Sequence, residues 1–177
     1  MFHRTKRLFL RPAWPEDWEA VFGGIADEGV VRNLARAPWP YSADDARAFV
    51  SRPQDARRPS FLLIHPSDGL AIGCAGLGDH EGEAELGYWI ARPFWGRGYA
   101  TEAGQGVLEV ARLLGISRVC AGHFVDNPAS GRVLRKLGFV PTGHTRPRLS
   151  CARGGEVPAH EYVLDLDAGA NARMCAA

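Results

Sequence analysis

The sequence predicts an α+β domain, close to the α/β class, with a mixed central sheet of about seven strands and helices on both faces. Segments with strand-like alternation and segments with helical spacing follow one another along most of the 177 residues. Short turns separate three consecutive expected strands, which favours antiparallel neighbours. One long expected helix then links two strands, as in a parallel crossover. A chain of this length fits one domain, which we place at residues 5–167.

The first third of the chain is expected to hold one strand and two helices. Lys6–Arg11 alternates polar and apolar residues, as a strand does. Pro15-Glu16-Asp17 opens a helix, because proline and acidic side chains favour a first turn. Ser42 is a suitable N-cap for a second helix, from about Ala43 to Val50. The prolines of Ala37–Tyr41 exclude a helix between the two.

The later elements alternate more regularly. The three consecutive strands are expected at Ser60–His65, Leu70–Leu77 and Ala84–Ile90. A long helix from about Tyr99 to Leu114 has apolar residues at helical spacing, and Gly115 can end it in the left-handed conformation. A buried strand, a capped helix and two further strands follow, at Arg118–Val125, Pro128–Leu137, Phe139–Thr145 and His160–Leu166. The alanine-rich segment 168–177 lacks periodicity and is expected to be frayed.

Composition and charge exclude several classes of function. A formal net charge of +1 provides no general attraction to nucleic acid or to a membrane surface, so neither is an expected partner. The first apolar run, Leu8-Phe9-Leu10, is too short for a signal peptide, and no stretch approaches a membrane span. The cysteines lack metal-ligand spacing, so we expect no metal site and inert thiols in a reducing cytoplasm. They are Cys74, Cys120, Cys151 and Cys175.

The most informative segment, Trp95–Thr101, joins the end of a strand to the long helix and contains two glycines. Glycines let a ligand approach the backbone, and the first turn of a helix has unpaired N–H groups at the positive end of its dipole. Such a loop favours phosphate binding. The P-loop pattern G-x-x-x-x-G-K-[ST] is absent, and Thr101 stands where a dinucleotide fingerprint needs its third glycine. The alternative is an ordinary turn before a helix.

This segment resembles the pyrophosphate loop of the GNAT family of N-acetyltransferases. The family pattern is Q/R-x-x-G-x-G/A before a long helix, and Trp95 departs from it by replacing Gln or Arg. The longer form W-G-x-G-Y-A-T-E-A is similar to the subgroup that acetylates the N-termini of ribosomal proteins. The resemblance implies that backbone amides of this loop hold the pyrophosphate of coenzyme A. The implied coenzyme-binding residues are Trp95, Gly96, Arg97, Gly98, Tyr99, Ala100 and Thr101.

A second segment, Asn127–Phe139, matches the family motif N-x-x-[AS]-x-x-x-[YL]-x-K-L-G-F. From the residues alone, Asn127 is a good helix N-cap and Pro128 a good first helical residue. The resemblance implies that Asn127 hydrogen-bonds the pantetheine arm. Leu134 stands where many members have a tyrosine that protonates the departing thiolate. The resemblance assigns that catalytic role, and a place against the coenzyme, to Ser130; the alternative is a hydrogen bond from its hydroxyl to the helix backbone.

Acetyl transfer to an amine needs a proton acceptor for the amine and a donor for the tetrahedral oxyanion. The resemblance implies a GNAT fold with a splayed notch between two parallel central strands, where a backbone N–H near Trp89, Ile90 or Ala91 is the donor. Glu85, on the same expected strand, is the first candidate base; the alternative is an ordinary pair with a basic residue. His123 is the second candidate. Glu161 and His160, on the last expected strand, are further candidates, and water relaying a proton to Glu85 is another route.

The sequence therefore predicts a cytoplasmic N-acetyltransferase that moves an acetyl group from acetyl-CoA to a primary amine by direct attack, without a covalent enzyme intermediate. By subgroup resemblance, the acceptor is the N-terminal amine of a protein or peptide. A small-molecule amine, such as an antibiotic or an amino acid, is the alternative among enzymes. A non-catalytic coenzyme A sensor is the alternative of another class. Dimers are common in such folds, so a homodimer is a further expectation to test.

Overall fold

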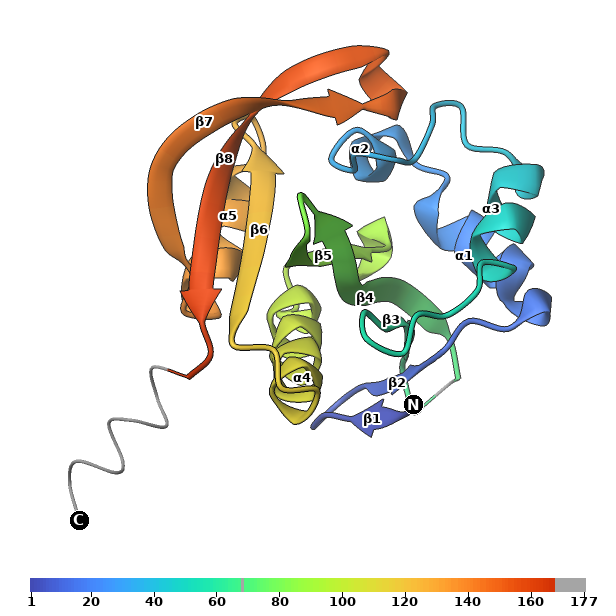
Figure 1. The fold of residues 1–177 in the computed structure, drawn as a ribbon. Coiled ribbons are helices and arrows are strands. Elements are labelled where there is room, and N and C mark those ends of the chain that lie inside the picture. Colours follow the sequence, from blue (N-terminus) through green and yellow to red (C-terminus); the bar gives the residue numbers. More distant parts are fainter. Residues whose placement is uncertain (68, 168–177) are drawn as a thin grey trace.

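The computed structural model describes residues 1–67 and 69–167, and it shows one open mixed sheet (Figure 1). Its eight strands lie in the order β1-β2-β3-β4-β5-β6-β8-β7. Neighbouring strands are antiparallel except β5 and β6, which are parallel. The predicted class is confirmed; the expected frayed tail, 168–177, lies outside the described residues. The strands are His3–Arg4 (β1), Phe9–Arg11 (β2), Ser60–Ile64 (β3), Ala71–His80 (β4), Glu83–Ile90 (β5), Arg118–Phe124 (β6), Val140–Ser150 (β7) and Gly155–Asp165 (β8).

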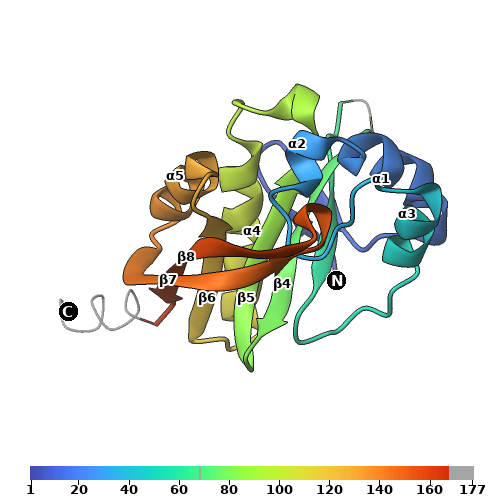
Figure 2. The same cartoon turned by 90° about the horizontal axis from the view of Figure 1, so that it is seen from above.

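Helices cover both faces of the sheet (Figure 2), and each face has its own apolar core. On one face, α4 (Tyr99–Leu113) and α5 (Pro128–Lys136) bury side chains such as Val107 and Leu134. On the other face, α1 (Trp18–Ile25), α2 (Glu28–Val31) and α3 (Ala43–Val50) do the same. Three short 3₁₀ turns complete the chain, at Pro15–Asp17 (η1), Arg92–Phe94 (η2) and Cys151–Arg153 (η3).

The N-terminal strand is shorter than predicted. Instead of one strand over Lys6–Arg11, the chain makes a tight turn between β1 and β2. The Thr5 N–H donates to the Leu8 carbonyl at 2.9 Å, and the Leu8 N–H donates to the Thr5 hydroxyl at 3.1 Å. A threonine that offers local hydrogen bonds competes with strand pairing in this way. The turn separates β1 from β2, and β1 is the additional strand that makes the sheet eight-stranded instead of seven-stranded as predicted.

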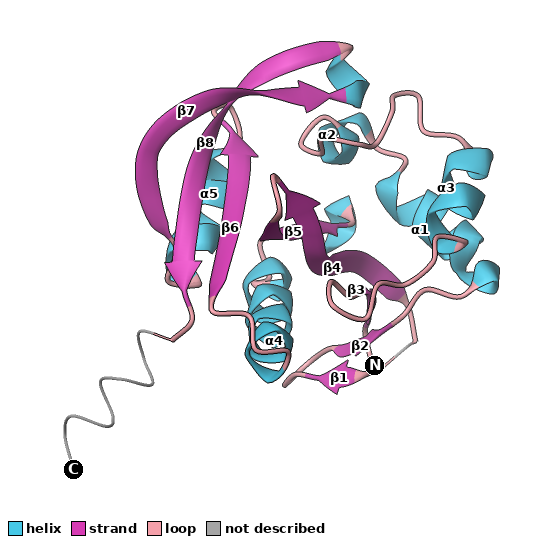
Figure 3. Cartoon of the chain, in the orientation of Figure 1, coloured by secondary structure: helices cyan, strands magenta, loops and turns pink. Residues whose placement is uncertain are grey.

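The last hairpin is longer than predicted. β7 and β8 extend well beyond the expected strands and arch across to α2, where η3 forms their tip (Figure 3). Prolines concealed this extension, because they weaken a strand pattern. Pro147 and Pro158 face each other in the hairpin, and β8 has passed the end of β6 at Pro158. The arch matters for function because it brings a remote segment over the middle of the sheet.

The two parallel central strands separate from each other. β5 and β6 pair only at Ala84 with Val119 and at Glu85 with Cys120, near the start of both strands. β5 then continues to Ile90 while pairing with β4 alone. One edge of β5 is therefore released from the sheet after Glu85. This is the predicted splayed notch, and Glu85 lies at its base.

Candidate functional site

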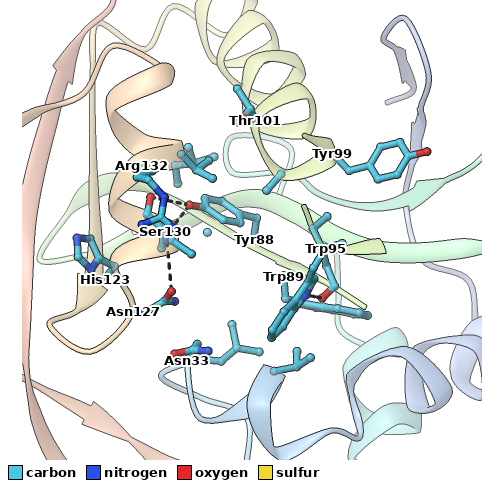
Figure 4. A pocket seen from close by; sticks show the side chains of 18 of the residues that line it. Asn33, Tyr88, Trp89, Trp95, Tyr99, Thr101, His123, Asn127, Ser130 and Arg132 are labelled. Atoms are coloured by element: carbon cyan, nitrogen blue, oxygen red, sulfur yellow. Dashed lines mark hydrogen bonds between the residues drawn. The ribbon is translucent and has the colours of Figure 1, made fainter. Parts of the chain in front are cut away.

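The notch opens into a cavity of about 580 Å³ (Figure 4), within the size range of small-molecule sites. β5 forms its floor, and the start of α4 and the start of α5 form its walls. The end of β6, including His123, the loop after α2 and Arg148 of β7 also contribute to the lining. The cavity therefore joins the two segments that carried the family motifs. Both had been predicted to bind one coenzyme.

The glycine loop has the conformation of an anion cradle. Gly96 and Gly98 have φ of 75° and 81°, in the left-handed region that favours glycine. Gly98 is the N-cap of α4, and the first helical hydrogen bond runs from Glu102 N–H to the Gly98 carbonyl at 3.1 Å. The N–H groups before Glu102 thus precede the helix ladder and form its positive end. A Cβ placed on Gly96 would meet no atom within 4 Å, so that surface is open to a ligand.

The side chains after Gly98 divide between the cavity and the core. Tyr99 is buried and packs beside Phe94, with the Arg7 guanidinium 4.6 Å from its ring centre. Ala100 and Thr101 line the cavity at the start of α4. The Arg97 guanidinium lies over the Phe94 ring, 5.7 Å from its centre. The loop therefore presents its backbone to the cavity, whereas the side chains of Arg97 and Tyr99 pack against Phe94.

Trp95, the departure from the family pattern, folds back onto β5. Its indole N–H donates to the Ile90 carbonyl at 2.6 Å. The Ala91 N–H is already used, since it donates to the Ile72 carbonyl of β4 at 2.8 Å. Because such bonds alternate along an antiparallel ladder, the N–H and C=O of Ile90 face the notch, whereas those of Trp89 face β4. Of the three backbone N–H groups expected as donors to the oxyanion, those of Trp89, Ile90 and Ala91, the one that faces the notch is therefore that of Ile90.

The second motif forms a capped helix whose first turn faces the notch. Asn127 is the N-cap of α5, and its Oδ1 accepts the Ser130 N–H at 3.3 Å. The Ser130 hydroxyl lies 2.8 Å from the hydroxyl of Tyr88 on β5 (Figure 4). Burial raises the pKa of Tyr88 to about 12, so the phenol stays protonated at neutral pH. Leu134 is 1% exposed and belongs to the core.

Glu85 lies on the other face of β5 from Tyr88 and forms an ion pair with Arg148. Both side chains are 20% exposed. The basic partner anticipated for Glu85 is thus present, but it comes from the β7–β8 arch and not from the neighbouring strand. Glu85 and Arg148 also line a second cavity, of about 310 Å³, below that arch. The pair separates the two cavities and can be reached from either.

His123 lies on the α5 face of β6, against Gly131. It is 8% exposed, with Nδ1 2.8 Å from the Phe124 carbonyl and Nε2 3.3 Å from the Tyr162 hydroxyl. Burial lowers the pKa of His123 below its usual range. Both ring nitrogens are engaged and the ring faces away from Glu85. This geometry supports His123 as a base less well than it supports Glu85.

A clasp of charged groups fixes the arch over the second cavity. The Arg153 guanidinium of η3 bonds both carboxylate oxygens of Asp126, at 2.9 and 3.0 Å. Arg32, at the end of α2, donates to the same carboxylate at 3.1 Å. Hydrogen bonding from Arg153 holds the pKa of Asp126 below its usual range. Sequence reasoning missed this Arg32–Asp126–Arg153 clasp, because its members are far apart in the chain and match no motif.

The three described cysteines are free thiols. Cys74 and Cys120 are buried free thiols, and burial raises the pKa of each to about 11. Cys151 is exposed and free, and Cys175 lies outside the described residues. Within residues 1–67 and 69–167, no cluster of His, Cys, Asp and Glu could hold a metal ion. Over the same ranges, none of the helices is both long and apolar enough to cross a membrane.

Comparisons with known proteins identify the family of the chain. Residues 7–140 match the family model of the acetyltransferase (GNAT) domain. The uncharacterized N-acetyltransferase YnaD of Bacillus subtilis is 30% identical over 143 residues, covering 78% of this chain and 82% of YnaD. A GNAT-family acetyltransferase structure from Bacillus anthracis has a TM-score of 0.82 at 24% identity, covering 94% of this chain and 99% of that one.

RimL, a ribosomal L7/L12 alpha-N-protein acetyltransferase solved with coenzyme A, has a TM-score of 0.77 at 21% identity. The match covers 95% of this chain and 99% of RimL. At such identities the solved structures show a shared fold. The family model spans about three quarters of the chain, and it includes the glycine loop and the α5 motif. The chain therefore belongs to the GNAT family and is an N-acetyltransferase.

Proposed function

We propose that acetyl-CoA is the donor and that it binds along the notch, with its pyrophosphate at the glycine loop and its thioester beside Ser130. The observation that carries this proposal is one continuous cavity from the loop to the Tyr88–Ser130 hydroxyls, with a released strand edge as its floor. The open surface at Gly96 suits close approach of a phosphate. The Ile90 N–H, at that released edge, is positioned for the pantetheine arm or the thioester oxygen.

Asn127 and Ser130 extend this binding surface. The Asn127 Oδ1 is occupied by the Ser130 N–H, so the side-chain NH₂ is the part that can donate to pantetheine. Ser130 follows in the same first turn, and its hydroxyl reaches the floor of the cavity at Tyr88. A hydroxyl at that place stabilises a departing thiolate as its negative charge develops. Asn127 and Ser130 belong to the same helical turn, so their separation is fixed and both side chains can contact the same ligand.

The acceptor reaches the notch from the opposite face, below the β7–β8 arch. Among the residues that the structure describes, Glu85 is the one carboxylate that lines both cavities. It takes one proton from the protonated amine, directly or through one water, and the neutral amine then attacks the thioester carbon. The second proton, which the nitrogen loses as the amide forms, goes to solvent. The carbon–sulfur bond breaks, the sulfur keeps the electron pair, and the thiolate is finally protonated by solvent. Arg148 pairs with Glu85 and thereby fixes its carboxylate at the base of the notch.

The best-supported acceptor is the N-terminal amine of a protein or peptide. The W-G-x-G-Y-A-T-E-A form supports this class, and RimL, which shares the fold over nearly the whole chain, acts on such a substrate. The second cavity leads to the base from outside, as an extended N-terminus requires. A cytoplasmic location and a homodimer, both expected from the sequence, stay predictions.

The test is release of free thiol from acetyl-CoA in the presence of three sets of amines. The first set is short peptides with free N-termini, the second is the same peptides blocked at the N-terminus but carrying a lysine, and the third is small-molecule amines. We expect turnover with the first set. Turnover confined to the third set would replace the acceptor class, and binding of acetyl-CoA without thiol release in any set would favour a sensor.

A further inference from the structure

Two hydroxyl groups from different elements meet inside the coenzyme cavity. The Tyr88 hydroxyl of β5 and the Ser130 hydroxyl of α5 are 2.8 Å apart, across the mouth of the notch (Figure 4). The Tyr88 hydroxyl is also 3.4 Å from the Ser130 carbonyl, at the long limit for a hydrogen bond. Both residues line the cavity. Tyr88 carried no motif signal, although alternation along the strand places it on the face of α4 and α5.

The pair is distinct among the hydroxyls of this cavity. Within the described chain, the other hydroxyl-bearing residues of its lining are Tyr99 and Thr101. Tyr99 points away from Ser130 and packs beside Phe94 (Figure 4). Thr101 lies in the first turn of α4, at the glycine loop. Tyr88 is thus the hydroxyl that can set the orientation of Ser130.

A hydroxyl that must assist a departing thiolate has a directional requirement. Ser130 has one proton, and that proton must point to the sulfur. If Ser130 instead donated to Tyr88, its oxygen lone pairs would face the developing negative charge and repel it. The hydroxyl of Tyr88 decides between these arrangements, because a phenol that donates to Ser130 leaves the serine proton free for the ligand. Donation from the phenol also strengthens the hydrogen bond that Ser130 in turn donates to the sulfur.

We propose that Tyr88 is a positioning residue of the acetyl-transfer step, which donates a hydrogen bond to Ser130 and thereby aims the serine proton at the coenzyme sulfur. The proposal rests on the proposed function, in which Ser130 assists the thiolate. No proton leaves Tyr88 in the reaction. The carbon–sulfur bond breaks with its electron pair on sulfur, Ser130 shares its proton with that sulfur, and the sulfur is later protonated by solvent. The amine proton leaves through Glu85.

The chemistry favours a shared hydrogen bond over full proton transfer from Tyr88. A thiol has a pKa near 8.5, whereas burial raises the pKa of Tyr88 to about 12. A thiolate is therefore too weak a base to deprotonate this phenol. The phenol keeps its proton throughout turnover and acts as a permanent donor to Ser130. This distinguishes Tyr88 from the tyrosine acid that the family places at Leu134.

Tyr88→Phe and Ser130→Ala, alone and combined, test this assignment in single-turnover acetyl transfer to the most active acceptor of the amine panel. Each single variant should slow the step about tenfold, the value of one hydrogen bond at the reacting sulfur. The double variant should be no slower than Ser130→Ala, because Tyr88 acts only through Ser130. Affinity for acetyl-CoA should stay within about twofold of wild type, since each change removes a single hydroxyl.

Tyr41→Phe is the matched control. Its phenol is also buried, with a pKa raised to about 12, but it belongs to the core under α1–α3 and lines neither cavity. Its rate should equal that of wild type. Incorporation of 3-fluorotyrosine at position 88 provides a second check, because it keeps the ring and makes the phenol a stronger donor. That protein should be as fast as wild type or faster; a loss like that of the Phe variant would assign the effect to ring packing and overturn the proposal.

The outcomes separate the two proposals. If wild type releases no thiol with any acceptor, the proposed function fails and the role of Tyr88 fails with it. If Ser130→Ala is slow and Tyr88→Phe is as fast as wild type, the function stands and the role of Tyr88 is overturned; the phenol then donates to the Ser130 carbonyl. Independent losses that multiply in the double variant would also overturn it. If Ser130→Ala is as fast as wild type, both hydroxyls lose their roles.

Discussion

The two sides of the notch are built in different ways. In the proposed function, the coenzyme side takes its binding groups from two short continuous segments, 89–101 and 127–130, and the glycine loop offers mainly backbone N–H groups. On the acceptor side, Glu85 depends on Arg148 of β7, and the roof depends on the Arg32–Asp126–Arg153 clasp. One side is held by local conformation, and the other is held by ion pairs between remote segments. The coenzyme side should therefore respond to changes in backbone conformation, and the acceptor side to changes in charge.

The largest expected effect is that of Glu85→Gln. The change keeps the shape of the side chain and removes the base, so we expect acetyl transfer to slow by about 100-fold while acetyl-CoA affinity stays unchanged. Glu83→Gln is the matched comparison, because Glu83 lies on the same strand, pairs with Arg118 at 3.7 Å and lines neither cavity. Equal losses in the two variants would show that general charge, and not a base, was removed.

Arg148→Met separates a catalytic role of Glu85 from a structural one. If Glu85 only ties β5 to the arch, losing either partner of the pair has the same effect on rate. If Glu85 is the base, Arg148→Met leaves it in place and lowers the rate less than Glu85→Gln does. The pH–rate profiles of the two variants provide this measurement.

The second effect, on the coenzyme side, is that of Gly98→Val. At φ 81° a β-branched residue is strained, so the loop must change its conformation and lose its aligned N–H groups. We expect acetyl-CoA affinity to fall by about tenfold or more, which is about 1.4 kcal/mol. Gly143→Val is the control, since Gly143 has φ 84° in β7 with no atom near its Cβ position. Calorimetry should show wild-type affinity for the control; an equal loss in both variants would contradict the loop assignment.

A third, smaller effect is expected for Arg153→Ala. Removing this guanidinium opens the clasp and loosens the arch over the acceptor, because Arg153 also bonds the Arg32 carbonyl at 2.8 Å. The KM for the acceptor should rise about threefold, as expected for a partly exposed ion pair, with acetyl-CoA affinity unchanged. Arg47→Ala, which removes an exposed pair with Asp44 on α3, should leave both constants unchanged. If Arg153→Ala changed the affinity for acetyl-CoA and left the KM for the acceptor unchanged, the clasp would support coenzyme binding, and the prediction would be wrong.

The smallest effect concerns His123 and the pH dependence of stability. Burial lowers the pKa of His123 in the folded protein, so the unfolded chain binds its proton at a higher pH than the folded one. The stabilisation is complete above the unfolded pKa of about 6.5 and is lost as pH falls through the lowered folded value. His123→Gln should flatten the decline of the free energy of unfolding below pH 6.5. The exposed His144→Gln should not, and denaturant titrations at several pH values compare the two.

The same contrast explains what could be read from the sequence. The loop at Gly98 and the cap at Asn127 are local, since each depends on residues a few positions away, and both were predicted at the correct place. Leu134 replaces the tyrosine of the family motif and is buried in the core, and no feature of that motif indicated that Tyr88 would contact Ser130. That contact joins residues 42 apart in the chain. Contacts of this kind depend on sheet order and arch length, which no local pattern records.

Calorimetric titration of the wild-type protein with acetyl-CoA, alongside NADH and ATP, is the sharpest test of the proposed coenzyme A site. We expect selective micromolar binding of acetyl-CoA, about 8 kcal/mol of binding free energy, because the notch accepts a thioester arm as well as a pyrophosphate. ATP and NADH share the adenosine and the phosphates of coenzyme A but lack the pantetheine arm and the thioester, so they should bind far more weakly. Stronger binding of NADH, or no binding of acetyl-CoA, would contradict the assignment of the glycine loop and the notch to one coenzyme A site.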